Sequence, residues 1–189
     1  MLQHVLESAL RQTMNRLVRP VLNPAVPVPL QRRIVRQAYR SSTPPRGAKF
    51  ENITIGGVPA TRTTFGNDPR GAVLYLHGGG YIIGSSSTHR GITGHLAKTT
   101  GCAIVTPDYR LAPEFPFPAA LDDAEACWNG LLEAGLKPDQ IAVAGDSAGG
   151  GLSVALAMRL RDKGLQLPAS LTAFSPWIDL TPVSYTHLR

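Results

Sequence analysis

Four short, continuous apolar runs constrain the fold of this chain more than any other feature. Runs of this kind, without apolar–polar alternation, are typical of strands that are buried on both faces of a sheet. They cover residues 72–76, 103–106, 141–144 and 171–174. Helical apolar spacing fills the stretches between them, at 88–100, 119–134 and 148–163. This order predicts an α/β fold with a mostly parallel, doubly wound sheet and right-handed crossovers.

The segment before the first buried run has a different pattern. Residues 50–65 alternate between apolar and polar side chains around Gly56 and Gly57. This pattern predicts a hairpin with a two-residue primed turn, because such turns need positive φ at both positions. The sheet is therefore expected to begin with antiparallel strands.

Residues 1–48 are expected to form a separate N-terminal helical segment, and residues 49–189 to belong to the α/β core. Four prolines at positions 20–29 cannot lie in a helix interior, so they join a first helix to a second one near residues 30–40. The first helix has apolar residues that share one face, namely Leu2, Val5, Leu6, Ala9, Leu10, Leu17 and Val18.

Charge is concentrated at the N-terminus. Residues 1–49 carry nine Lys or Arg against Glu7 alone, and the other 140 residues carry ten against twelve Asp or Glu. A membrane-surface or nucleic-acid helix is one reading, and an amphipathic helix packed on the core is the favoured one. No aromatic residue is interleaved with the basic ones before Tyr39, which argues against stacking on nucleic acid.

Several classes are excluded by composition. No apolar run approaches the roughly 20 residues that span a bilayer, so stable membrane insertion is not expected. Cys102 and Cys127 have no metal-ligand spacing around them and predict free, partly buried thiols, with no metal site. Gln3, His4 and Glu7 interrupt the N-terminal apolar residues, so no secretory signal is predicted and a cytoplasmic protein is expected.

The third apolar run leads directly into Gly145-Asp146-Ser147-Ala148-Gly149 and then a helix. A serine on a sharp strand-to-helix turn needs small neighbours, and the turn leaves its hydroxyl exposed at the helix N-terminus. An ordinary serine N-cap with glycine-rich packing explains the pentapeptide equally well. A second motif favours the catalytic reading.

That second motif is His77-Gly78-Gly79-Gly80-Tyr81, at the end of the first buried run. Backbone amides of such a loop can approach a ligand closely, and donors from Gly78, Gly79 and Ala148 predict an oxyanion hole for acyl transfer. A phosphate loop is disfavoured, because neither G-x-G-x-x-G nor a Walker lysine is present.

Four motifs in order resemble the hormone-sensitive-lipase-like branch of the α/β-hydrolase esterases and lipases. They are His77-Gly78-Gly79-Gly80, Asp108-Tyr109-Arg110-Leu111-Ala112-Pro113-Glu114, Phe117-Pro118-Ala119-Ala120 and Gly145-Asp146-Ser147-Ala148-Gly149-Gly150. The resemblance covers about residues 50–181, and more loosely the N-terminal helices, which form part of a cap in this family. It implies hydrolysis of short- to medium-chain carboxylic esters without a cofactor, by a protein that could form a homodimer at full length.

By this resemblance Ser147 is the nucleophile, and Gly78, Gly79 and Ala148 donate to the oxyanion. His77 and Gly80 would support the glycine loop, and His77 would not be the base. Candidates for lining the pocket are Tyr81, Tyr109 and Asp146.

Other polar residues receive structural readings. Asp108, Arg110 and Glu114 are expected to brace the loop after the second buried run. His89 and His95 are interpreted as ordinary histidines of a helix. Asp146 is not expected to orient a catalytic imidazole, because its position in the turn faces the serine.

The family's acid and histidine follow the serine in later loops. The 42 residues after Ser147 contain Asp162, Asp179 and His187, and none has the expected context. The chain is therefore interpreted as the N-terminal part of a longer esterase, with residues 182–189 of uncertain origin. An amidase or thioesterase on the same fold, or a non-catalytic binding protein, are the alternatives.

Overall fold

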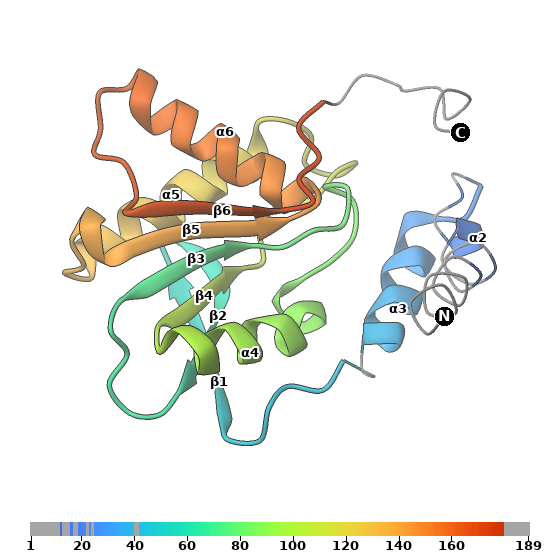
Figure 1. The fold of residues 1–189 in the computed structure, drawn as a ribbon. Coiled ribbons are helices and arrows are strands. Elements are labelled where there is room, and N and C mark those ends of the chain that lie inside the picture. The colour runs from blue at the N-terminus through green and yellow to red at the C-terminus, as the bar shows by residue number, and fades with distance from the viewer. Residues whose placement is uncertain are drawn as a thin grey trace, which may run out of the picture.

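The computed structural model describes residues 12, 16, 19–21, 23, 25–39 and 42–179. Within these residues the core is a six-stranded mixed sheet in the order β1-β2-β4-β3-β5-β6 (Figure 1). Its strands are β1 (Ala48–Ile55), β2 (Val58–Phe65), β3 (Ala72–Leu76), β4 (Ala103–Pro107), β5 (Ile141–Asp146) and β6 (Ser170–Phe174). The predicted α/β fold with an antiparallel start is confirmed.

The hairpin between β1 and β2 has the predicted two-residue turn. Ile55 lies opposite Val58, and Gly56 and Gly57 have φ values of +56° and +80°. β2 pairs antiparallel with β4, and every later pairing in the sheet, from β4 through β3 and β5 to β6, is parallel.

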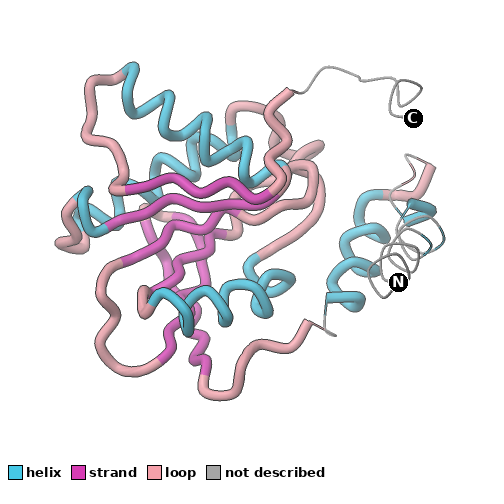
Figure 2. Tube along the Cα trace, viewed as in Figure 1, coloured by secondary structure: helices cyan, strands magenta, loops and turns pink. Residues whose placement is uncertain are grey.

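Helices cover both faces of the sheet. α4 (Arg90–Thr100) lies on one face, and α5 (Ala119–Glu133) and α6 (Ala148–Asp162) lie on the other (Figure 2). Alternate residues of β3 explain why this strand is apolar throughout. Leu74 and Leu76 belong to the cluster that includes Trp128 of α5, and Tyr75 belongs to the cluster that includes Ala97 of α4.

The last strand differs from the prediction of burial on both faces. That prediction is confirmed for β3 and β4, whose residues are all buried, and largely for β5. β6 is the edge strand of the described sheet and pairs with β5 alone, so Leu171 and Phe174 remain 37% and 39% exposed. An apolar run shows that a strand can be buried, but its neighbours decide whether it is.

The N-terminal segment contains α2 (Arg19–Val21) and α3 (Val28–Ala38). α3 begins two residues before the predicted helix, because a proline in the first turn lacks an amide that would be unpaired there anyway. The predicted apolar face of the first helix (Leu2, Val5, Leu6, Ala9, Leu10, Leu17 and Val18) lies outside the described residues. No helix in the described ranges has the length and apolarity needed to cross a membrane.

The hairpin turn makes a prediction about stability. A Cβ atom on Gly56 would lie 1.9 Å from the carbonyl oxygen of Ala126 in α5, whereas one on Gly57 would meet nothing within 4 Å. Gly57→Ala is expected to lower the free energy of unfolding by about 1–2 kcal/mol through left-handed strain alone. Gly56→Ala adds the backbone collision and should cost about 2–5 kcal/mol. Urea unfolding of both variants tests this, and equal losses would contradict the close approach.

Candidate active site

Ser147 lies on the predicted sharp turn between β5 and α6. Its φ and ψ of 51° and −120° are strained for a residue with a side chain, and the residue is exposed. The flanking glycines are required by space. A Cβ on Gly145 would lie 2.4 Å from the carbonyl oxygen of Gly149, and one on Gly149 would lie 2.0 Å from that of Leu76.

Two backbone hydrogen bonds hold the turn against the end of β6. The Ser147 amide donates to the Phe174 carbonyl at 2.9 Å, and the Trp177 amide donates to the Ser147 carbonyl at 2.8 Å. The strained conformation is therefore fixed by neighbouring chain on both sides. This position presents the serine hydroxyl to the space beyond the carboxyl ends of β3 and β5.

The glycine loop follows β3 and lies beside this turn. The Gly78 amide donates to Oδ1 of Asp146 at 2.9 Å, so it is not free to donate to an oxyanion as the sequence analysis expected. The reason is the close packing of the two strand ends, since a Cβ on Gly78 would lie 2.2 Å from Oδ2 of Asp146. In the described part of the chain the amides of Gly79 and Gly80 have no hydrogen-bond partner.

His77 supports the glycine loop from behind. Its ring is fully buried, stacks on Tyr109 with centroids 4.2 Å apart, and places Nδ1 2.9 Å from the carbonyl oxygen of Gly78. That carbonyl and the Gly79 amide belong to one planar peptide and point in opposite directions. His77 therefore orients the Gly79 N–H. Burial, together with the neighbouring His89, lowers the pKa of His77 to about 3, so the ring is neutral. Because a carbonyl oxygen can only accept a hydrogen bond, Nδ1 carries the proton and donates to the Gly78 carbonyl.

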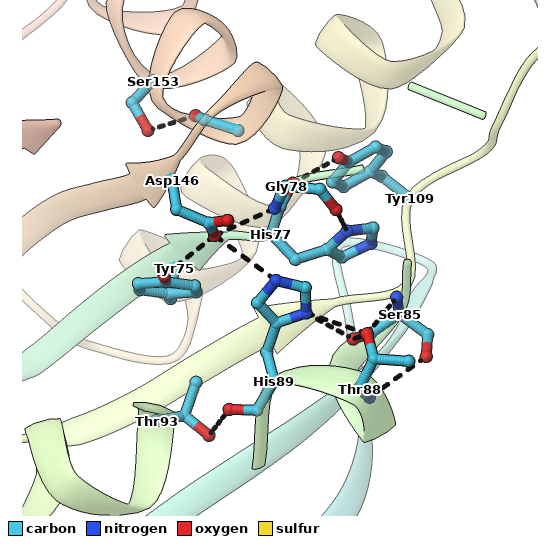
Figure 3. A network of polar contacts seen from close by, with 11 residues as sticks. Tyr75, His77, Gly78, Ser85, Thr88, His89, Thr93, Tyr109, Asp146 and Ser153 are labelled. Carbon is cyan, nitrogen blue, oxygen red and sulfur yellow. Dashed lines mark hydrogen bonds and ion pairs between the residues drawn. The ribbon is translucent and has the colours of Figure 1, made fainter. Parts of the chain in front are cut away.

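Asp146 is the centre of the polar network at the site (Figure 3). Besides Gly78, it accepts a hydrogen bond from the Tyr75 hydroxyl at 2.9 Å and lies 3.4 Å from Nε2 of His89. Burial raises the pKa of Asp146, but the contacts with these groups outweigh burial and hold the pKa below its ordinary value. The carboxylate thus joins the ends of β3 and β5.

His89 is a site residue that the sequence analysis missed. It ends the 3-10 helix η3 (Ser86–His89), its ring is buried, and it stacks on Tyr39 at the end of α3. No motif marks His89, because its contact with Asp146 joins segments far apart in the sequence. His95, by contrast, is exposed on α4, as expected for an ordinary histidine.

A cavity of about 680 Å³ lies above Ser147 and the glycine loop. Its lining residues are Gln31, Val35, Tyr39, Gly78, Gly79, Gly80, Ile82, Ile83, Gly84, Thr88, His89, Asp146, Ser147 and Trp177. Asp146 therefore lines this cavity, whereas Tyr109 stacks on His77. Tyr81 borders a second, apolar groove. Trp177 forms a wall of the cavity.

α3 is fastened to the site by one arginine. Nε of Arg32 donates to the Ile82 carbonyl at 2.8 Å, and its terminal nitrogens donate to the Ala112 carbonyl and to both carboxylate oxygens of Glu114 at 2.8–2.9 Å. The helix that supplies Gln31, Val35 and Tyr39 to the cavity is thereby tied to the glycine loop.

The charged residues after β4 are structural, as expected, but they do not pair with one another. Asp108 accepts hydrogen bonds from the amide and hydroxyl of Ser86, Arg110 pairs with Asp123 at 2.8 Å, and Glu114 pairs with Arg32. Each braces the loop against a different element.

No histidine of the described residues hydrogen-bonds the Ser147 hydroxyl. His77 and His89 are engaged with the glycine loop and Asp146, and His95 lies on the surface of α4. His187 lies outside the described residues, and Asp162 pairs with Arg161 at the end of α6.

The lowered pKa of Asp146 makes a prediction about pH. A carboxylate whose pKa is lower in the folded state stabilises the fold above its ordinary pKa of 3.8, and this stabilisation is lost as the pH falls through the lowered folded value. The difference in unfolding free energy between wild type and Asp146→Asn should be largest near neutral pH and shrink as the pH falls below 3.8.

Urea unfolding across this pH range is the measurement, with Asp162→Asn as a control for an exposed carboxylate. A difference that stays constant down to the acid limit would show that the Asp146 charge does not stabilise the network.

Comparison with known proteins agrees with this fold. An acetyl-hydrolase of Streptomyces hygroscopicus is 42% identical over 135 residues, which are 71% of this chain and 45% of that protein. A crystal structure of an esterase from the bacterial hormone-sensitive lipase family is 39% identical with a TM-score of 0.84, over 93% of this chain and 60% of that one. A hormone-sensitive lipase from a metagenome library is 36% identical with a TM-score of 0.88, over 96% and 59%.

The chain spans about half the length of the relatives that it matches. Residues 73–188 match the family described by the α/β-hydrolase fold. That match includes the glycine loop, the strand that ends at Asp146 and the turn at Ser147. The sheet order, the strained serine and the sequence match together assign this chain to the α/β-hydrolase family.

Proposed function

We propose that this chain carries the nucleophile and the oxyanion hole of a serine carboxylic ester hydrolase. The observation that supports this proposal most directly is that Ser147 lies in a strained, exposed turn beside a glycine loop whose Gly79 and Gly80 amides have no partner among the described residues. The named relatives, an acetyl-hydrolase and esterases, support the same chemistry. In this reaction the Ser147 oxygen attacks the ester carbonyl, the alcohol leaves with a proton, and water then releases the carboxylic acid.

The oxyanion donors proposed here are the amides of Gly79, Gly80 and Ala148. Gly79 and Gly80 have no partner among the described residues, and Ala148 is the first residue of α6, where amides lack intrahelical acceptors. Gly80 replaces Gly78 in this assignment, because the Gly78 amide is held by Asp146. Gly78 instead fixes the loop.

The general base and its acid partner are proposed to come from outside the described residues. We also propose, from the sequence, that residues 1–48 form a cap segment and residues 49–189 the hydrolase core. The proposed substrate is a small-molecule ester, the proposed assembly is a homodimer, and the proposed location is the cytoplasm.

The first prediction concerns the nucleophile. Ser147→Ala should abolish labelling by a fluorophosphonate, read by intact mass spectrometry, and lower kcat/KM for p-nitrophenyl butyrate by roughly 10⁴-fold or more. Ser153→Ala is the control, because the Ser153 hydroxyl is buried in α6 and donates to the Gly149 carbonyl. Both the chain and a fusion to the remaining C-terminal part of the Streptomyces acetyl-hydrolase are assayed.

Labelling that persists in Ser147→Ala would show that the nucleophile is misassigned. Turnover by the chain alone would place the base within these residues and make His187→Ala the next variant. Folded wild type that binds esters but is neither labelled nor active in either form would favour the non-catalytic binding protein.

The second prediction concerns the orientation of the Gly79 peptide. His77→Asn removes the ring that holds the Gly78 carbonyl and should lower kcat by about 10–100-fold, part of what loss of a whole oxyanion donor costs. KM should change little, because the donor acts on the transition state. His95→Asn, on the exposed face of α4, should leave both constants unchanged. Active-site titration separates slower catalysis from loss of folded protein.

A further inference from the structure

The ring of His77 has a second nitrogen that the glycine loop does not use. Nε2 is buried and makes no hydrogen bond to any described residue. Because Nδ1 carries the proton of this neutral ring, Nε2 is unprotonated and can only accept a hydrogen bond. A buried acceptor in a folded protein is normally paired, so this atom calls for a donor that the described residues do not supply.

A cavity of about 490 Å³ lies beside this ring. His77 lines it, whereas Gly78, Gly79 and Gly80 do not, so it differs from the cavity above Ser147. Figure 3 shows the Nε2 side of the ring turned away from Asp146. A volume of several hundred Å³ is sufficient for a small organic molecule.

The lining includes one cation whose charge is not paired. Arg32 is bound by Glu114, and Arg110 is bound by Asp123, so these two guanidinium charges are already neutralised. Arg36 lies one turn after Arg32 on α3 and has no ion pair or hydrogen bond with another described residue. A carboxylate is the ligand group that a guanidinium binds best, through two parallel hydrogen bonds.

Asp108 gives the cavity a polarity. This carboxylate lines the cavity, accepts the amide and hydroxyl of Ser86 at 2.6 and 3.0 Å, and precedes Tyr109, which stacks on His77. An anionic group is therefore favoured at Arg36 and disfavoured near Asp108. At the His77 end a hydroxyl fits better than an ammonium, because Nε2 offers one hydrogen bond and no charge.

We propose that this cavity is a second ligand site, which binds a short hydroxycarboxylate with its carboxylate on Arg36 and its hydroxyl donating to Nε2 of His77. The site does not rest on the proposed function, since neither Ser147 nor an oxyanion donor lines it. Its ligand would contact the ring that orients the Gly79 peptide, on the nitrogen that this peptide leaves unused.

The ¹⁵N chemical shift of Nε2 is a direct readout, because it changes when this nitrogen accepts a hydrogen bond. The signal is assigned in histidine-labelled protein by its loss in His77→Asn. Titration with sodium 3-hydroxybutyrate should move it upfield in a saturable way. Sodium butyrate, which lacks the hydroxyl, and 1,3-butanediol, which lacks the carboxylate, should leave it in place at the same concentrations.

Three variants locate the bound molecule. Arg36→Gln should weaken 3-hydroxybutyrate binding at least about tenfold, because a charge-assisted pair is lost. Arg36 is exposed, so this variant should fold. Arg33→Gln is the matched control, since Arg33 is exposed on the same helix and does not line the cavity. Ser147→Ala should bind 3-hydroxybutyrate as wild type does.

An Nε2 signal that ignores 3-hydroxybutyrate would show that ordinary water supplies the donor, and it would overturn the site. Equal shifts with butyrate, or unchanged affinity in Arg36→Gln, would contradict the assigned hydroxyl and carboxylate contacts and overturn it as well. Loss of binding in Ser147→Ala would place the ligand in the other cavity. Failure of Ser147 labelling with binding intact would overturn the proposed function and leave this site standing.

Discussion

The site depends on the hydrogen bonds that the Asp146 carboxylate accepts. It stands at the end of β5, next to Ser147, and accepts the amide of Gly78 at the end of β3. Because β3 and β5 are parallel neighbours, their carboxyl ends meet at one edge of the sheet. The hydrogen bond therefore fixes the distance between the glycine loop and the serine turn. His77 completes the arrangement by holding the other side of the same loop.

Close approach of the backbone explains why glycines occupy the turn on both sides of Ser147. The peptides of Gly145 and Gly149 touch each other and the end of β3, and a Cβ on either would collide with a carbonyl oxygen. The cavity above this turn is bordered by α3, which Arg32 ties to Ile82 and Glu114. An N-terminal helix of basic character thus serves the site by packing, and its Arg32 is a structural cation.

Local patterns predicted most of the fold, because strand and helix periodicity depend on residues close in sequence. The buried runs, the Gly56–Gly57 turn and the three crossover helices were found at nearly their observed bounds. The exposure of β6 was not foreseen, since the same apolar run is buried or exposed according to its neighbours in the sheet. The strained turn at Ser147 was predicted from the glycines around it.

Contacts between distant segments were beyond the reach of the sequence. Nothing in it indicates that His89 meets Asp146, that Trp177 borders the serine, or that the Gly78 amide is taken by a carboxylate. The sequence by itself determined the α/β order, the serine turn and the glycine loop, because each is encoded by residue types at short spacing. Only the tertiary structure decided which amides of the glycine loop lack a partner among the described residues and which side chains line the cavity, because the packing of whole strands determines the hydrogen-bond partners.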